Sequence, residues 1–129
     1  MTFCLGAANF GSKYGISNTK KISKLNSSKL INYFLKKKQN YIDTAEAYKG
    51  SNLHILQHLK KRSLREKKNI NIITKVKYKF KKKKNYLVSR AKFNLSYFKI
   101  KKLYGYLLHD LNFDKNKTNL KMINEQFKI

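Results

Sequence analysis

Residues Asn40–Ser51 read Asn-Tyr-Ile-Asp-Thr-Ala-Glu-Ala-Tyr-Lys-Gly-Ser. The apolar pair Tyr41-Ile42 has the character of a short buried strand, and a carboxylate, Asp43, ends it. Tyr48 follows on the next segment, just before Gly50-Ser51, which are residues typical of loops and helix starts. The stretch therefore predicts an acid and a weak proton donor on one rim, where a strand meets its loop.

Three further apolar segments have the length and composition of strands. The clearest is Ile70–Val76, which is rich in β-branched residues and bounded by charged flanks. The predicted strands are Phe3–Ala8, Tyr41-Ile42, Ile70–Val76 and Leu103–Leu108. A glycine-punctuated loop follows the first strand over Asn9–Gly15, and a lysine-rich connector follows the third over Lys77–Lys84.

Apolar residues at helical spacing lie between these strands. We predict a helix capped by Asn26 or Ser27 and running to about Lys38, one capped by Ser51, one running to about Ile100, and a last one over Asn119–Phe127. The inward faces are expected to be Leu30, Ile31, Phe34 and Leu35 in the first helix, Leu53, Leu56 and Leu59 in the second, and Leu87, Ala91, Leu95 and Phe98 in the third, with His54 and His58 facing solvent.

The alternation of near-continuous apolar strands with amphipathic helices indicates an α/β fold with a parallel sheet. Right-handed crossovers bring the carboxyl ends of all the strands to one side, where such sheets carry their chemistry. Asp43, Lys75 and His109 end three consecutive strands, each about one strand–helix unit after the last. These three residues and Tyr48 are therefore expected to converge, although each alone is more simply explained as a structural or surface residue.

Size and composition describe a single domain. At 129 residues the chain is long enough for a hydrophobic core. Cys4 is its one cysteine, which excludes a disulfide framework and favours a reducing compartment, and we expect Cys4 to be a buried apolar residue of the first strand. The sequence shows neither a membrane-spanning run nor a signal peptide, so we expect a soluble cytoplasmic protein without membrane contact.

The net charge of +25 invites a nucleic-acid hypothesis. All but three of the 31 basic residues are lysines, the exceptions being Arg62, Arg65 and Arg90. Base-edge recognition favours arginine, and the scarcity of arginine favours solvated lysine faces over a dedicated site. We expect nucleic acid to bind only through nonspecific charge. A lysine-rich protein that binds nucleic acid or other polyanions, with a vestigial rim, remains the alternative function.

The run from Asp43 to Tyr48, Asp-Thr-Ala-x-x-Tyr, resembles the end of the second barrel strand in the aldo-keto reductase family. The opening Leu5–Ile16, Leu-Gly-Ala-Ala-Asn-Phe-Gly-Ser-Lys-Tyr-Gly-Ile, is similar to that family's first strand and loop. The resemblance implies a partial (β/α)8 TIM barrel of about four strand–helix units. Since a complete barrel needs about 250 residues, residues 1–129 are expected to form the N-terminal half, with the C-terminal half absent.

The same resemblance implies catalytic roles for Asp43, Tyr48, Lys75 and His109. Tyr48 would be the general acid as hydride passes from NADPH or NADH to the carbonyl of an aldehyde or ketone. Lys75 would lower the pKa of Tyr48, Asp43 would hold Lys75, and His109 would orient the carbonyl. Gly6, Ala7 and Asp43 would contact the cofactor, although Gly6-Ala7 stands where the family usually has Gly-Thr.

Other sites are less well supported. Gly6–Lys13 approaches a phosphate-binding loop, but its final Ser-Lys is transposed and no helix is predicted directly after it. Glu46, His54 and His58 could suggest a metal, but no further ligand lies at suitable spacing, so none is expected. A four-stranded piece would leave the edges of its first and fourth strands unpaired, and self-association through these edges is a further hypothesis.

Overall fold

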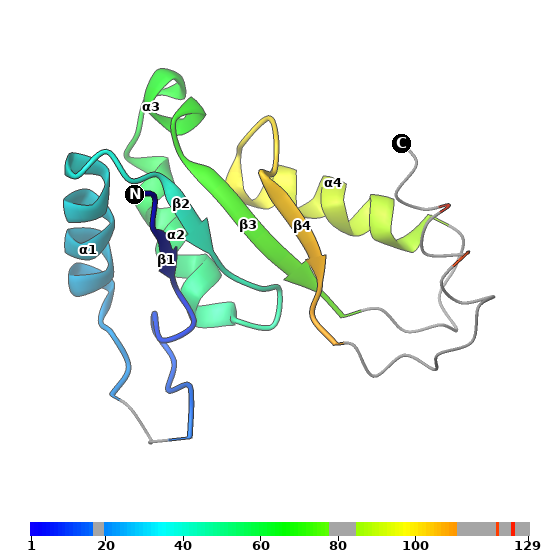
Figure 1. The fold of residues 1–129 in the computed structure, drawn as a ribbon, viewed down its shortest axis with the longest axis horizontal. Helices are drawn as coiled ribbons and strands as arrows, with labels where there is room; N and C mark the ends of the chain where they lie inside the picture. The colour runs from blue at the N-terminus through cyan, green and yellow to red at the C-terminus, as the bar shows by residue number, and fades with distance from the viewer. Residues whose placement is uncertain (17–19, 78–84, 111–120, 122–124, 126–129) are drawn as a thin grey trace.

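A computed structural model of the chain describes residues 1–16, 20–77, 85–110, 121 and 125. Strands and helices alternate along the chain (Figure 1). The elements are β1 (Cys4–Gly6), α1 (Lys24–Lys36), β2 (Tyr41–Asp43), α2 (Lys49–Lys60), α3 (Leu64–Lys68), β3 (Asn71–Val76), α4 (Tyr86–Phe98) and β4 (Gly105–Leu108). The strands form one parallel sheet in the order β1-β2-β3-β4. This confirms the predicted α/β half-barrel architecture.

Some predictions cannot be compared with this structure. The predicted last helix, Asn119–Phe127, lies almost entirely outside the described residues, as does the lysine-rich connector after Lys77. Strands β1 and β4 are the outer strands of the described sheet, and self-association through them stays a prediction. None of the helices in the described ranges is long and apolar enough to cross a bilayer.

The strand register separates two faces of the sheet. Leu5, Ile42 and Ile72 are aligned across β1, β2 and β3. They pack against residues of the helices in the main core, which contains the buried side chains of Ala7, Phe10, Ile31, Ile42, Ile55, Leu59, Ile70, Ile72 and Phe98. Residues on either side of this row point the other way, because side chains alternate along a strand.

The second face of the sheet carries Cys4, Tyr41 and Asn71 in one row. Among the described residues no helix covers it, and in Figure 1 α2 and α4 lie behind the strands. The prediction that Cys4 is buried is therefore wrong, since its side chain is exposed. Because helices cover only one face of the first strand, only alternate residues of β1 are buried. Cys4 lies on the uncovered face.

Two predicted helix starts are corrected by the structure. Helix α1 begins a turn earlier than expected, because the side chain of Ser23 accepts a hydrogen bond from the Asn26 backbone N–H at 3.2 Å. Ser27, one of the predicted caps, is buried within the helix. Helix α2 starts at Lys49, so Ser51 is also an internal helical residue.

The inward face of α2 differs from the prediction. Its buried residues are Ser51, Asn52, Ile55, His58 and Leu59, a set at helical spacing. The leucine spacing favoured a different face, yet Leu53 is 47% exposed. Polar residues occupy the inward face because each finds a hydrogen-bonding partner there. Leucine content alone could not reveal those partners.

Two histidines of α2 contact serines of α1, which corrects the prediction that both face solvent. His54 Nδ1 lies 2.9 Å from Ser27 Oγ, and His58 Nδ1 lies 3.1 Å from Ser28 Oγ. His58 is only 5% exposed. Burial, and then the nearby positive charges of the residues after α2, lower the pKa of His58 to about 4. The neutral imidazole is therefore the form that the folded helix pair accommodates.

We expect acid to weaken the fold through His58. Its pKa falls from 6.5 to about 4 on folding, so its contribution is complete above pH 6.5 and is lost as the pH falls toward 4. The loss amounts to at most about 3 kcal/mol. Urea titrations at several pH values measure this slope. The variant His58→Gln should show a shallower slope, and equal slopes for the two proteins would contradict the assignment.

The central strand supplies the most sensitive core position. Ile72 is fully buried between its neighbours on β2 and the helices behind the sheet. Ile72→Ala is expected to lower the free energy of unfolding by about 2–5 kcal/mol, because it removes apolar contacts and leaves a cavity. Ile16→Ala, at a fully exposed isoleucine, is the control and should change it by less than about 0.5 kcal/mol. Similar losses in the two variants would show that this core does not carry the stability.

Candidate active site

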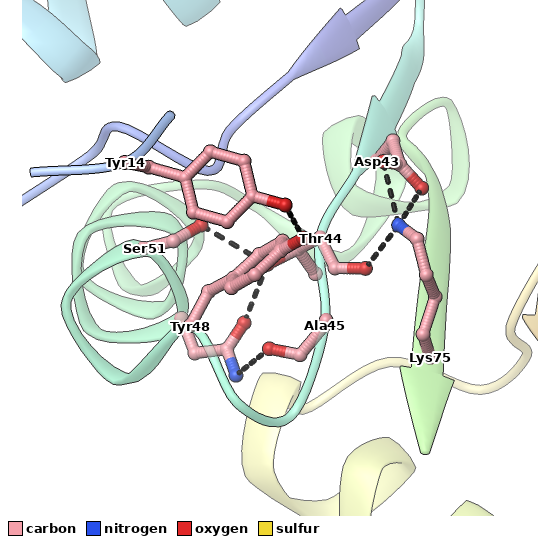
Figure 2. Close-up of polar contacts among 8 residues, drawn as sticks. Tyr14, Asp43, Thr44, Ala45, Tyr48, Ser51 and Lys75 are labelled. Carbon is pink, nitrogen blue, oxygen red and sulfur yellow. Dashed lines mark hydrogen bonds and ion pairs between the residues drawn. The ribbon is translucent and has the colours of Figure 1, made fainter. Parts of the chain in front are cut away.

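An ion pair joins the carboxyl ends of β2 and β3. Lys75 Nζ lies 2.6 Å and 2.7 Å from the two carboxylate oxygens of Asp43, and it donates a third hydrogen bond to the Thr44 carbonyl at 3.0 Å (Figure 2). Asp43 is aligned with Ile73, and Lys75 lies two residues further along β3. The two charged side chains therefore share the uncovered face of the sheet.

Backbone hydrogen bonds fix the turn that follows β2. The Thr44 N–H donates to the Ile73 carbonyl, and the Glu46 N–H donates to the Lys75 carbonyl, both at 2.9 Å. The Tyr48 N–H donates to the Ala45 carbonyl at 2.9 Å, and Tyr48 is the N-cap residue of α2. The turn is thus tied to β3 at two points before it delivers Tyr48.

A buried polar cluster supports the same turn from beneath. Thr44 Oγ1 lies 3.0 Å from Ser51 Oγ and donates to Asn52 Oδ1 at 2.7 Å. Asn52 Nδ2 donates to the Ala45 carbonyl at 3.0 Å (Figure 2). Buried polar groups that are fully hydrogen-bonded hold a segment in one geometry, because breaking any of these hydrogen bonds leaves an unpaired polar group that water cannot reach. The cluster therefore fixes the start of α2 relative to β2.

A second support comes from α4, and it was not predicted from the sequence. Arg90 Nε and an Arg90 terminal nitrogen donate to Glu46 Oε2 at 3.0 and 2.8 Å, and Asn94 Nδ2 donates to Glu46 Oε1 at 2.6 Å. Asn94 is buried. Glu46, considered above only as a weak metal-ligand candidate, instead anchors the turn to the helix behind the sheet.

The structure brings all four predicted catalytic residues together. Lys75 Nζ lies 5.8 Å from the centre of the Tyr48 ring, and the ring centres of Tyr48 and His109 lie 5.5 Å apart, edge to face. The His109 N–H donates to the Val76 carbonyl at 2.9 Å, which holds this residue at the end of β4. Among the described residues His109 Nδ1 is buried without a hydrogen-bond partner.

A fifth residue, Tyr14, joins the site. Tyr48 Oη donates a hydrogen bond to Tyr14 Oη at 3.0 Å, and the ring centres lie 5.1 Å apart (Figure 2). The loop that carries Tyr14 lies against the first turn of α2. Even a Cβ at Gly50 would stand 2.7 Å from Ser12 Oγ and 2.9 Å from the Gly11 carbonyl carbon. Gly50 of α2 and Gly11 of the loop were the signal in the sequence for this close approach.

The pKa of Tyr48 differs from the prediction. Burial first, then the hydrogen bond to Tyr14 and the charges of Tyr14 and Asp43, raise the pKa of Tyr48 to about 12. We expected Lys75 to lower it. The Lys75 ammonium instead contacts both oxygens of Asp43, and the Asp43 charge is itself one of the causes that raise this pKa. Tyr48 is therefore a protonated phenol in this structure.

The predicted cofactor contacts lie beside this cluster. Gly6 is aligned with Asp43, and a Cβ placed at Gly6 would meet open space. The Ala7 side chain is fully buried in the main core, and its N–H donates to the Asp43 carbonyl at 2.9 Å. No three His, Cys, Asp or Glu side chains within the described ranges are grouped so that they could hold a metal ion.

The structure is a half-barrel of the α/β class with one polar rim. Its parallel strands carry an aspartate, a lysine and a histidine at their carboxyl ends, and a tyrosine lies on the adjoining loop. The model of the Aldo/keto reductase family matches residues 2–129. The chain belongs to the aldo/keto reductase family.

Solved structures agree on the fold. A crystal structure of a suspected aldo-keto reductase from Pseudomonas aeruginosa superposes with a TM-score of 0.68 at 20% identity, covering 94% of this chain and 49% of that one. A second structure of a suspected aldo-keto reductase from the same organism gives a TM-score of 0.61 at 17% identity, covering 95% and 49%. The chain thus spans about half the length of these structures. The search of curated proteins found no match.

Proposed function

We propose that this chain carries the proton-transfer residues of an oxidoreductase that reduces an aldehyde or ketone with a nicotinamide dinucleotide. The observation that carries the proposal is the Asp43–Lys75 ion pair, in which Lys75 Nζ lies 5.8 Å from the centre of the Tyr48 ring. Because the chain spans about half of the solved structures it matches, the activity of a whole reductase is itself part of the proposal.

Tyr48 is the proton donor in this proposal. With a pKa near 12 its hydroxyl keeps its proton at neutral pH, so a proton is present to give. Transfer leaves negative charge on the phenol oxygen, and the Lys75 ammonium is the cation placed to stabilise it. Asp43 keeps Lys75 aimed, at the cost of offsetting part of its field.

His109 and Tyr14 both lie next to the phenol ring. The His109 ring centre lies 5.5 Å from that of Tyr48, and this position beside the proton donor suits a role in orienting the substrate carbonyl. The Tyr14 hydroxyl oxygen accepts a hydrogen bond from the Tyr48 hydroxyl, and a carbonyl oxygen would accept the same hydrogen bond. A carbonyl that takes the place of Tyr14 as acceptor is the event that this proposal requires.

The residues at the end of β1 fit the reactive end of the cofactor. The open space above Gly6, beside Asp43, leaves room for a flat ring against the uncovered face of the sheet. When bound, the nicotinamide supplies hydride to the carbonyl carbon. Gly6 and Asp43 would hold it, while Ala7 would contribute through its backbone alone, because its side chain is in the core.

A spectrophotometric assay tests the proposal. Oxidation of NADPH and of NADH is followed with a panel of aliphatic and aromatic aldehydes and ketones. The proposal predicts oxidation that requires both the chain and a carbonyl compound. Absence of carbonyl-dependent oxidation with every member of the panel would contradict it.

A further inference from the structure

A pocket of about 470 Å³ lies at the other end of the sheet, next to α3 and the loop that precedes β4. In Figure 1 these two segments flank the start of β3, at the end of the strand opposite its arrowhead, whereas the Asp43–Lys75 ion pair joins the carboxyl ends of β2 and β3. The residues that line it are Leu64, Arg65, Lys67, Lys68, Ile70, Lys99, Ile100, Lys101 and Lys102. None belongs to the candidate active site, and the volume is that of small-molecule sites, roughly 300–1,000 Å³.

The walls of the pocket are held in place. Helix α3 begins with a capping box, in which the side chain of Ser63 accepts a hydrogen bond from the Glu66 backbone N–H and the side chain of Glu66 accepts one from the Ser63 backbone N–H. The Ile70 N–H donates to the Lys67 carbonyl at 3.1 Å. On the opposite wall, the Ile100 N–H donates to the Leu95 carbonyl at 3.1 Å. Backbone hydrogen bonds therefore hold the two segments that carry the lining residues.

The pocket is strongly positive. Of the nine described residues that line it, six are lysine or arginine and none is acidic. Glu66, the acid on α3, instead binds Arg62 at 2.8 Å and lines a separate depression. Among the described residues, the ion pairs of Asp43, Glu46, Glu66 and Asp110 all involve cations outside this pocket. Six cations that make no ion pair with a described residue surround this pocket, and they favour a ligand with more than one negative charge.

The apolar part of the lining indicates what else the ligand carries. Leu64, Ile70 and Ile100 are aliphatic, and none of the described residues that line the pocket is aromatic. Nucleic-acid bases and nucleotides are usually held by stacking on aromatic rings, so this lining does not favour them. Lysines bind phosphate as point charges, and aliphatic side chains bind hydrocarbon. We propose that the pocket binds a phosphate monoester that bears an aliphatic chain.

Titration calorimetry with hexyl phosphate, at low salt and with the full chain, tests this proposal. We expect saturable binding, at least about tenfold tighter than that of inorganic phosphate, because the alkyl chain gains apolar contacts. Lys101→Gln/Lys102→Gln, at two exposed positions, should weaken it about tenfold. The matched control Lys21→Gln/Lys92→Gln removes the same charge elsewhere on the surface and should change affinity less than about twofold. Circular dichroism verifies folding of each variant.

A second variant separates the apolar contribution. Leu64 is 71% exposed, so Leu64→Ser leaves the core intact. It should weaken hexyl phosphate and leave inorganic phosphate unchanged. Equal weakening in the two lysine double variants would show bulk charge instead of a site. Tighter binding of adenosine monophosphate than of hexyl phosphate, or binding only to anionic lipid vesicles, would overturn the proposed ligand class.

Discussion

Replacing Tyr48 by phenylalanine is expected to lower kcat/KM for carbonyl reduction by about 10²–10⁴-fold, the usual contribution of a positioned acid. The substitution removes one oxygen and its proton. It keeps the ring that lies edge to face with His109 and beneath the Lys75 ammonium. The loss is measured from the rate of nicotinamide oxidation in stopped-flow or steady-state experiments. An unchanged free energy of unfolding shows that the variant keeps its fold.

The matched control is Tyr33→Phe. Tyr33 is 61% exposed on α1, so its substitution removes the same atom far from the rim and should leave turnover unaltered. Turnover that survives Tyr48→Phe within threefold of the wild-type value would rule out the phenol as the proton donor. Parallel losses in both variants would instead point to a general effect on the chain.

Lys75→Met is the second large effect, and we expect a loss in kcat/KM of at least about 10²-fold, as for removal of a charged group that stabilises developing charge. The substitution removes the ammonium near the phenol and leaves the Asp43 carboxylate unpaired. The Asp43 charge already raises the pKa of Tyr48. Without the Lys75 ammonium beside it, the Asp43 carboxylate should raise that pKa further. The rate should therefore fall, and the alkaline limb of its pH profile should move to higher pH.

Lys77→Met serves as the control for Lys75→Met. Lys77 follows β3 by one residue and makes an exposed ion pair with Asp110 at 3.6 Å. Such pairs contribute little, so the control should keep nearly full activity. If both lysine variants lost the same activity, the effect would reflect the charge of the region rather than the contact between Lys75 and Asp43.

The sequence was sufficient to predict the sheet and the rim. Apolar strands that alternate with helices leave few topologies, and the parallel ladder then places Asp43, Lys75 and His109 at one edge. The helix starts were less predictable. Ser27 and Ser51 are good capping residues by type, yet both lie inside helices, because an earlier residue began each one.

Two features of the site depended on contacts between distant segments. Tyr14 reaches Tyr48 only because its loop approaches α2 closely. The residues next to Tyr14 in the sequence do not predict this hydrogen bond. The direction of the Tyr48 pKa shift likewise depended on how Asp43 shares Lys75 and on how much of the phenol is shielded from water. Residue types at matched spacing identify candidate partners, while the balance of their charges needs the folded geometry.

The exposure of Cys4 has the same kind of cause. A strand covered on one face leaves alternate residues open, and sequence alone does not say which set the helices cover. His58 shows the opposite error, since a polar residue on a helix was assigned to solvent but lies in contact with Ser28. Both cases turn on which neighbouring element packs against a given face.

The central claim is that Tyr48 and Lys75 act as one unit, and a double-mutant cycle on kcat/KM tests it most directly. Tyr48→Phe, Lys75→Met and the double variant are compared with the wild-type chain on one carbonyl substrate. We predict that the double variant is no more than about threefold slower than the slower single variant, because the lysine has nothing to stabilise once the phenol is gone. Losses that multiply would show that the two residues act independently and would contradict this account.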